Sequence, residues 1–308
     1  MQLNWRGVMP ATTTAFDSAL NVDHEFVAKH AKWLIDNGCT AIIAPGSLGE
    51  SATLSFAEKS ALWSTLVVAV GDRVPVVAAI ASLSTAEAVL LAKRAVDAGC
   101  SGLMVLPPYV YRSEWREMKA HVQAVLRATN LPCMLYNNPV AYGTDFLPEQ
   151  IRELAQEHEN LAAVKESSTD VRRITWIKEL TGDRLEISVG VDDAIVEGIA
   201  AGAVGWVAGL VNALPKESVD LFNYAMNGEH EKARELYYWF LPLLRLDTAP
   251  KFVQLIKLVQ QEVGMGSTRV RPPRLELVGE ELEAARRAIR HALETRIALS
   301  TSLAARNP

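Results

Sequence analysis

One lysine stands where an amine could act as a nucleophile. Lys165 ends the apolar run at residues 161–164 and precedes the polar residues 166–168. An apolar run bounded in this way is typical of a buried parallel strand, so we expect this lysine at a strand end, facing a dry cavity. Burial disfavours the ammonium form, so the amine could attack a carbonyl carbon. A lone lysine there more often extends to water, so the prediction depends on neighbouring groups.

Two further strand ends carry groups that complement an amine. Tyr136 follows the apolar run at residues 131–135, and the sequence GSLGE at residues 46–50 follows the run at 40–44. A phenol can transfer protons, and the backbone amides of Ser47 and Leu48 can hold a carboxylate. Glycines end many strands, and no Gly-Lys-Ser/Thr follows to make a phosphate loop. The three strand ends together predict a Schiff-base site.

Apolar runs that could form strands recur at even intervals. They begin near residues 7, 40, 74, 101, 131, 161, 186 and 203, and helical patterns lie between them. Capping boxes that begin at Ser55 and Ser84 predict the start of two helices. Eight units of roughly 30 residues predict an α/β fold, a (β/α)8 TIM barrel. A doubly wound sheet is the alternative, but no Gly-x-Gly-x-x-Gly turn follows the first run.

The strand pattern stops after about residue 215. Residues 229–244 and 279–295 have helical patterns instead. We therefore predict a barrel with the active site at residues 1–228 and a C-terminal helical extension at residues 229–308. The sequence RPPR at residues 271–274 is predicted to be a charged surface loop between two of the helices.

Composition argues against several classes of function. The 308 residues include 31 basic and 36 acidic side chains with no basic stripe, so nucleic acid is not an expected partner. Residues 198–215 are uncharged but contain four glycines, so we predict no membrane span. The three cysteines lie in or beside apolar runs, and the N-terminus lacks the apolar core of a signal peptide. We therefore expect a cytoplasmic protein with reduced thiols.

Neither a metal nor a cofactor is expected. The six histidines lie in helical stretches or next to loops, and none is at a predicted strand end. This placement argues against a histidine-bound metal ion. Asp192 and Asp193 would face opposite ways in a strand, so we expect a loop or helix-capping role for them.

Four motifs, in this order, resemble the dihydrodipicolinate synthase / N-acetylneuraminate lyase family. They are GSLGES at 46–51, YNNP at 136–139, VKESS at 164–168 and GVDD at 190–193. The resemblance extends from Gly7 to about Leu293. It implies a class I aldolase-type enzyme that forms an imine with a 2-oxo acid, and a homotetramer with its C-terminal helices near the subunit contacts.

The resemblance also implies roles for individual residues. Lys165 would form the imine, Tyr136 would move protons, and Ser47 could relay them. We predict further that the substrate is bound by five residues: Leu48, Gly49, Asn138, Tyr142 and Val207.

Departures from the synthase pattern bear on the substrate. The synthases have two adjacent threonines in the turn, where this chain has Ser47 and Leu48. Ala141 stands where they have an arginine that binds the carboxylate of the second substrate, and Val110 replaces the second tyrosine of a pair that begins at Tyr109. Loss of a bidentate carboxylate clamp argues against lysine biosynthesis.

Residues 46–50 and 136–143 look most like the hydroxyproline-catabolic branch of the family. Its enzymes convert 1-pyrroline-4-hydroxy-2-carboxylate to 2-oxoglutarate semialdehyde and ammonia, so we expect a deaminase that acts on this cyclic imino acid. The alternatives are a 2-keto-3-deoxy sugar acid aldolase or dehydratase, a 4-hydroxy-tetrahydrodipicolinate synthase, and a catalytically silent ligand-binding barrel. Leu48 and Ala141 make the predicted pocket less polar than a polyol tail would prefer. Retention of all three reactive groups argues against the silent barrel.

Overall fold

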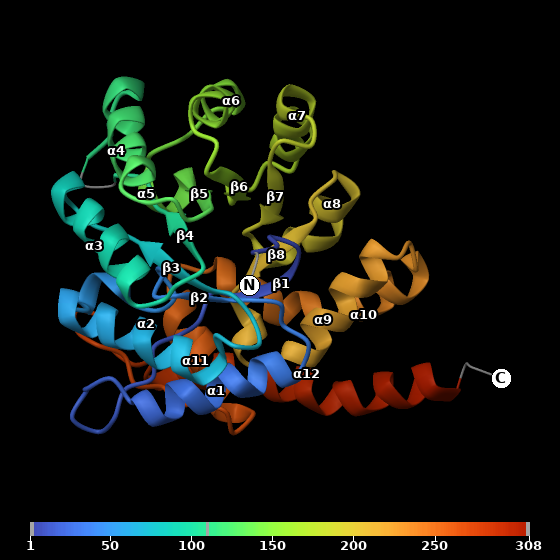
Figure 1. Cartoon of the computed structure of the whole chain (residues 1–308). Helices are drawn as coiled ribbons and strands as arrows, with labels where there is room; N and C mark the ends of the chain where they lie inside the picture. Colours follow the sequence, from blue (N-terminus) through green and yellow to red (C-terminus); the bar gives the residue numbers. More distant parts are fainter. Residues whose placement is uncertain (1–2, 109–110, 306–308) are drawn as a thin grey trace.

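The computed structural model describes residues 3–108 and 111–305, and its centre is a parallel sheet of eight strands curved into a barrel (Figure 1). The hydrogen-bonded order is β1-β8-β7-β6-β5-β4-β3-β2, and a parallel bridge between Ala11 and Ile43 joins the ends of the sheet. The predicted (β/α)8 barrel is confirmed. The strands are β1 Gly7–Pro10, β2 Ile42–Ala44, β3 Val76–Ile80, β4 Gly102–Val105, β5 Cys133–Asn137, β6 Leu161–Glu166, β7 Glu186–Val189 and β8 Gly205–Ala208.

Helices connect successive strands and surround the barrel. They are α1 His24–Asp36, α2 Phe56–Val70, α3 Thr85–Asp97, α4 Trp115–Arg127, α5 Pro139–Tyr142, α6 Pro148–Glu157, α7 Arg172–Thr181 and α8 Ile195–Ala200. The chain after β8 is helical, as predicted: α9 Pro215–Met226, α10 His230–Leu244, α11 Phe252–Glu262 and α12 Gly279–Ala305. No helix in the described part of the chain is both long and apolar enough to cross a membrane.

The two predicted capping boxes have different outcomes. Ser55 and Glu58 form a complete box at the start of α2. Ser84 caps α3 by accepting from the amide of Glu87 at 3.1 Å. The Glu87 carboxylate, however, accepts from the Ser82 hydroxyl at 2.6 Å. The second box is therefore half formed, because a nearer hydroxyl takes the acidic side chain.

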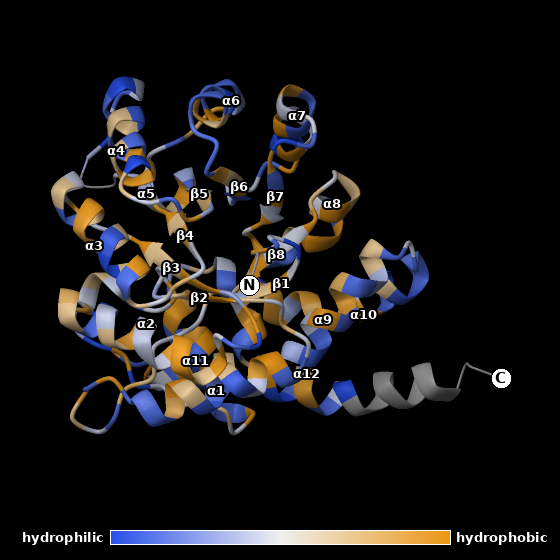
Figure 2. Ribbon diagram, viewed as in Figure 1, coloured by the Kyte–Doolittle hydropathy of each residue, from blue (hydrophilic) through white to orange (hydrophobic). Residues whose placement is uncertain are grey.

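Alternate residues of each strand face two different cores. Met134, Tyr136 and Ala163 belong to the apolar cluster inside the barrel, whereas Cys133 and Leu135 pack between the strands and the helices. Figure 2 shows hydrophilic residues on the outer turns of α4 and α6, at the rim of the molecule. Because side chains two residues apart share a strand face, this alternation directs Tyr136 into the barrel interior.

The C-terminal segments are bound to the glycine-rich turn after β2 by an ion pair and hydrogen bonds. Lys257 of α11 donates to the Glu50 carboxylate at 2.6 Å, and both side chains are buried. The Arg271 amide donates to the same carboxylate at 2.9 Å, and its guanidinium pairs with Glu58 at 2.6 Å. The guanidinium also lies 4.6 Å from the centre of the Phe16 ring. The prediction of a surface loop at residues 271–274 is therefore wrong for Arg271. The boundary at residue 228 stays a prediction.

Candidate active site

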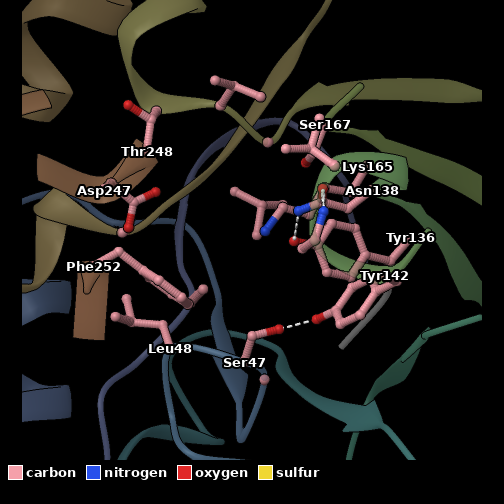
Figure 3. Close-up of a pocket in the computed structure, with 18 of the residues that line it drawn as sticks. Ser47, Leu48, Tyr136, Asn138, Tyr142, Lys165, Ser167, Asp247, Thr248 and Phe252 are labelled. Atoms are coloured by element: carbon pink, nitrogen blue, oxygen red, sulfur yellow. Dashed lines mark hydrogen bonds between the residues drawn. The ribbon is translucent and has the colours of Figure 1, made fainter. Parts of the chain in front are cut away.

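A cavity of about 360 Å³ lies at the C-terminal ends of the strands (Figure 3). This end of a (β/α)8 barrel is where the active sites of such enzymes are found, and the volume suits a small metabolite. Seven of the eight predicted site residues line the cavity: Lys165, Tyr136, Ser47, Leu48, Asn138, Tyr142 and Val207.

Lys165 and Tyr136 are neighbours across two strands. They are register partners on β6 and β5, and both are buried, with exposures of 6% and 5%. The lysine Nζ lies 4.3 Å from the centre of the tyrosine ring. The Tyr136 hydroxyl accepts from Asn138 Nδ2 at 2.9 Å, so its own proton stays available for the cavity. The pair therefore offers an amine and a proton-transferring phenol at one position.

The Lys165 side chain occupies space that is open only because residue 190, just after β7, is a glycine. A Cβ atom at this position would lie 2.5 Å from Lys165 Cε and would collide with the Ser167 hydroxyl. Carbon atoms of different side chains normally approach no closer than about 3.5 Å. A larger residue at 190 would therefore push the amine out of place.

The glycine-rich turn and α5 meet opposite the lysine. The Ser47 and Tyr142 hydroxyls are hydrogen-bonded, and the Tyr142 ring stands edge-on to Tyr136 with centroids 5.8 Å apart. No hydrogen bond within the described part of the protein uses the amides of Ser47 and Leu48. These amides remain available for a carboxylate, as the sequence predicts.

Gly49 is the predicted site residue that the structure places away from the cavity. A Cβ atom on it would lie 2.8 Å from the Thr12 carbonyl oxygen, and its own carbonyl accepts from Thr14 Oγ1 at 2.6 Å. Its position does not support substrate binding. It permits close packing of the turn against the segment after β1.

The cavity contains polar residues that were not predicted. Ser167 lies two residues after Lys165 and so shares its strand face, a signal that the period of β6 carries. Asp247, Thr248 and Arg274 arrive from outside the barrel, and no local motif marks them. Arg274 is half-exposed in the predicted loop, and from there it also reaches the cavity. The expectations for Tyr109 and Val110 lie outside the described residues.

Asp192 and Asp247 lie close together near the cavity, and each disfavours ionisation of the other. Asp192 lies in the 3-10 turn Asp192–Ala194 after β7 and accepts from Trp206 Nε1 at 2.9 Å and from the amides of Gly209 and Leu210 at 3.1 and 2.7 Å. Burial nevertheless raises the pKa of Asp192 to about 6. Burial and the Asp192 charge raise the pKa of Asp247 well above its usual range. Since Asp192 has the donors, it holds the charge, and Asp247 takes up the proton.

The groups in the cavity suit imine chemistry. A buried amine, a phenol, and two amides at a turn can bind a 2-oxo acid and move its protons. Within the part of the chain that the structure describes, no group of three or more His, Cys, Asp and Glu side chains could hold a metal ion.

Sequence comparison assigns the chain to a family. The profile of the Dihydrodipicolinate synthetase family matches residues 4–292. The chain belongs to this family. A 4-hydroxy-tetrahydrodipicolinate synthase of Methanocaldococcus jannaschii is 34% identical to this family member over 242 residues, which are 78% of this chain and 82% of the relative. The protein is thus a class I Schiff-base lyase.

Solved structures of dihydrodipicolinate synthases have the same fold. One, from Acinetobacter baumannii and complexed with pyruvate, has a TM-score of 0.89 and 26% identity and covers 94% of this family member and 99% of its own chain. Another, described as the first monomeric variant of this synthase, has a TM-score of 0.87 and 26% identity, with coverage of 92% and 96%. The curated relative carries the synthase name, so the comparisons do not support the predicted hydroxyproline-catabolic branch.

Proposed function

We propose that this protein forms an imine between Lys165 and a small 2-oxo acid or cyclic imino acid. The observation that carries the proposal is the buried amine, 4.3 Å from the Tyr136 ring and in register with it. The carboxylate of the substrate would lie at the unbonded amides of Ser47 and Leu48. This chemistry requires no cofactor.

The residues of the cavity can carry out the steps in order. The Lys165 amine attacks C2 of the substrate, and water or the ring amine departs to leave a protonated imine. The imine draws electrons from C3, so a C3 proton becomes acidic enough to remove near neutral pH. Tyr136 is placed to move this proton, and the hydrogen-bonded hydroxyls of Ser47 and Tyr142 continue the path.

The names of the relatives favour the synthase reaction, in which pyruvate condenses with aspartate semialdehyde. That second substrate brings its own carboxylate, and Ala141 cannot bind it. Arg274 lines the same cavity from the C-terminal linker and has no ion pair with another described residue. It is the group that would hold a second carboxylate if the protein were a synthase.

The walls of the cavity favour the deaminase reaction. A cyclic imino acid such as 1-pyrroline-4-hydroxy-2-carboxylate has one carboxylate, which the turn amides can bind without an arginine at 141. Leu48 removes a hydroxyl that the synthases have in the turn. We therefore propose the synthase, which the names of the relatives favour, as the first candidate for the finer function, and the deaminase, which the lining of the cavity suits, as the second.

Borohydride reduction tests the shared step. Incubation with pyruvate and borohydride should add mass to the peptide that contains Lys165, and Lys165→Ala should lose this label. Lys59 offers a matched control, because it is a second buried lysine, and its amine donates to the Ala81 carbonyl at 3.3 Å. Lys59→Ala should keep the label. A label that persists in Lys165→Ala would remove this lysine from the mechanism.

Product assays then separate the two finer reactions. The deaminase reading predicts ammonia from 1-pyrroline-4-hydroxy-2-carboxylate and little condensation of pyruvate with aspartate semialdehyde. Efficient condensation without ammonia release would establish the synthase instead.

We also propose that the protein is a homotetramer, as the family resemblance implies. A related synthase described as monomeric shows that the fold can exist without subunit contacts. Sedimentation equilibrium should give about four times the chain mass of 33.7 kDa. A mass equal to one chain would reject the tetramer.

A further inference from the structure

We propose that Asp247 binds a hydroxyl group on C4 of the substrate and protonates that hydroxyl as it leaves. The inference rests on the imine chemistry proposed above and extends it to a residue outside the barrel. The substrate class is a 2-oxo acid, or its cyclic imine, with a hydroxyl group on C4, the carbon two bonds from the imine carbon.

Asp247 occupies the side of the cavity that faces the reactive residues. It belongs to the 3-10 turn Arg245–Thr248, between α10 and α11. Figure 3 shows Asp247 and Thr248 on one side of the cavity, with Tyr136 and Tyr142 on the other. A substrate held at C2 by Lys165 would therefore extend its far end toward this carboxyl group.

The space that the Asp247 side chain occupies depends on a glycine at residue 209. A Cβ atom on Gly209, at the end of β8, would collide with Asp247 Oδ1. Only a glycine at 209 lets the carboxyl group rest against the strand end. The 3-10 turn therefore packs against the end of β8 through the Asp247 side chain.

The Asp247 side chain is half-buried, and its carboxyl group has no hydrogen bond to any other described residue. Its neighbour Asp192, by contrast, accepts from an indole and two amides. A polar group that lines a cavity without a partner in the protein is satisfied by a ligand or by water. In this position the ligand is the polar far end of the substrate.

The charges around Asp247 make it a hydrogen-bond donor. Asp192 and Asp193 oppose its ionisation, whereas Lys165 favours it. Arg245, on the same turn, lies 3.8 Å from Asp193. Asp192 holds the negative charge of the pair through its three donors, so Asp247 carries a proton. A protonated carboxyl group donates to a hydroxyl oxygen, the atom that must gain a proton to leave as water.

The elimination balances with the groups present. After the Tyr136 oxygen takes up a C3 proton and passes its own proton along the Tyr142 and Ser47 hydroxyls to water, the imine becomes an enamine with a C2=C3 bond. The nitrogen electron pair re-forms the C2=N bond, the C2=C3 pair moves to make C3=C4, and the C4–O bond breaks. The Asp247 proton joins the departing oxygen, and water leaves. The remaining carboxylate regains a proton from solvent, so no oxidant or reductant is needed.

The test compares Asp247→Asn with wild type on two substrates. With 1-pyrroline-4-hydroxy-2-carboxylate, we expect turnover to fall about 10²–10⁴-fold, the range for loss of a general acid. With the 4-fluoro analogue, fluoride needs no proton to leave, so its release, measured with a fluoride electrode, should stay within about threefold of wild type. Borohydride trapping of pyruvate, which lacks a C4 hydroxyl, should also be unchanged.

Asp220→Asn is the control, because Asp220 lies on α9, pairs with Lys216 and does not line the described cavity. It should behave as wild type on both substrates. Equal loss of water and fluoride elimination in Asp247→Asn would show a structural role and overturn the proposal, as would normal turnover. Failure of wild type to trap pyruvate would instead reject the imine function itself, so the two failures are distinguishable.

Discussion

Replacement of Gly190 by alanine should disable the imine-forming lysine while leaving the barrel folded. The added Cβ atom would lie 2.5 Å from Lys165 Cε, and ordinary carbon contacts begin near about 3.5 Å. The lysine must therefore move by about 1 Å, and a misplacement of that size lowers the rate of a positioned reaction by about 100-fold. Overpacking of this kind costs about 1–3 kcal/mol of folding stability.

The assay is the rate of pyruvate trapping by borohydride, measured beside the urea unfolding curve. Gly182→Ala is the control, because Gly182 has nothing within 4 Å of its added Cβ and a φ of +56°. It should lose about 1–2 kcal/mol from the left-handed backbone and trap pyruvate at the normal rate. Trapping in Gly190→Ala at the wild-type rate would show that the lysine does not need its observed position.

Three other predictions concern single side chains. Tyr136→Phe should still trap pyruvate, while turnover falls about 10²–10⁴-fold; normal kcat would remove the phenol from the mechanism. Arg274→Leu should weaken inhibition by a 2-oxo dicarboxylate about tenfold or more and leave inhibition by pyruvate unchanged; equal inhibition constants before and after would contradict this. Burial lowers the pKa of His30, whose Nε2 lies 2.8 Å from the Asn212 carbonyl oxygen, from 6.5 to about 4. Between these values the unfolded chain binds a proton that the native state does not, so stability should fall by up to about 3 kcal/mol as the pH drops from about 6.5 to 4. Urea titrations should show this loss in wild type, and in His30→Gln the loss should be smaller by about the same amount because His121 and His158 still titrate.

The barrel and its reactive pair were predictable because their signals are local. Each strand is a short apolar run, and the alternation within β5 and β6 decides which side chains face inward. Parallel strands end at the same rim, so Lys165 and Tyr136 had to meet there once the fold class was correct. In the structure the two residues are directly opposite each other on neighbouring strands.

The far side of the cavity was not predictable in this way. Asp247 and Arg274 reach it because a turn rests on Gly209 and a linker docks on Glu50. Both placements depend on contacts between segments distant in sequence, and no periodic pattern encodes them. The aspartate lies in a four-residue turn with no strand end near it, and the arginine lies in a proline-rich segment that resembles an exposed loop.

The buried pair between Glu50 and Lys257 has a consequence for how the enzyme is made. A ribosome completes all eight strands, with Lys165, Tyr136 and Ser47, before it reaches residue 257. Until then the Glu50 carboxylate has no buried cation, and the cavity lacks the wall that the late segments provide. Since domains begin to fold during synthesis, the nascent barrel would hold its amine in an unfinished site. The last fifth of the polypeptide, which contains Asp247, Phe252 and Arg274, therefore closes the active site, and a chain released early would carry the reactive residues without the enclosure that makes them an enzyme.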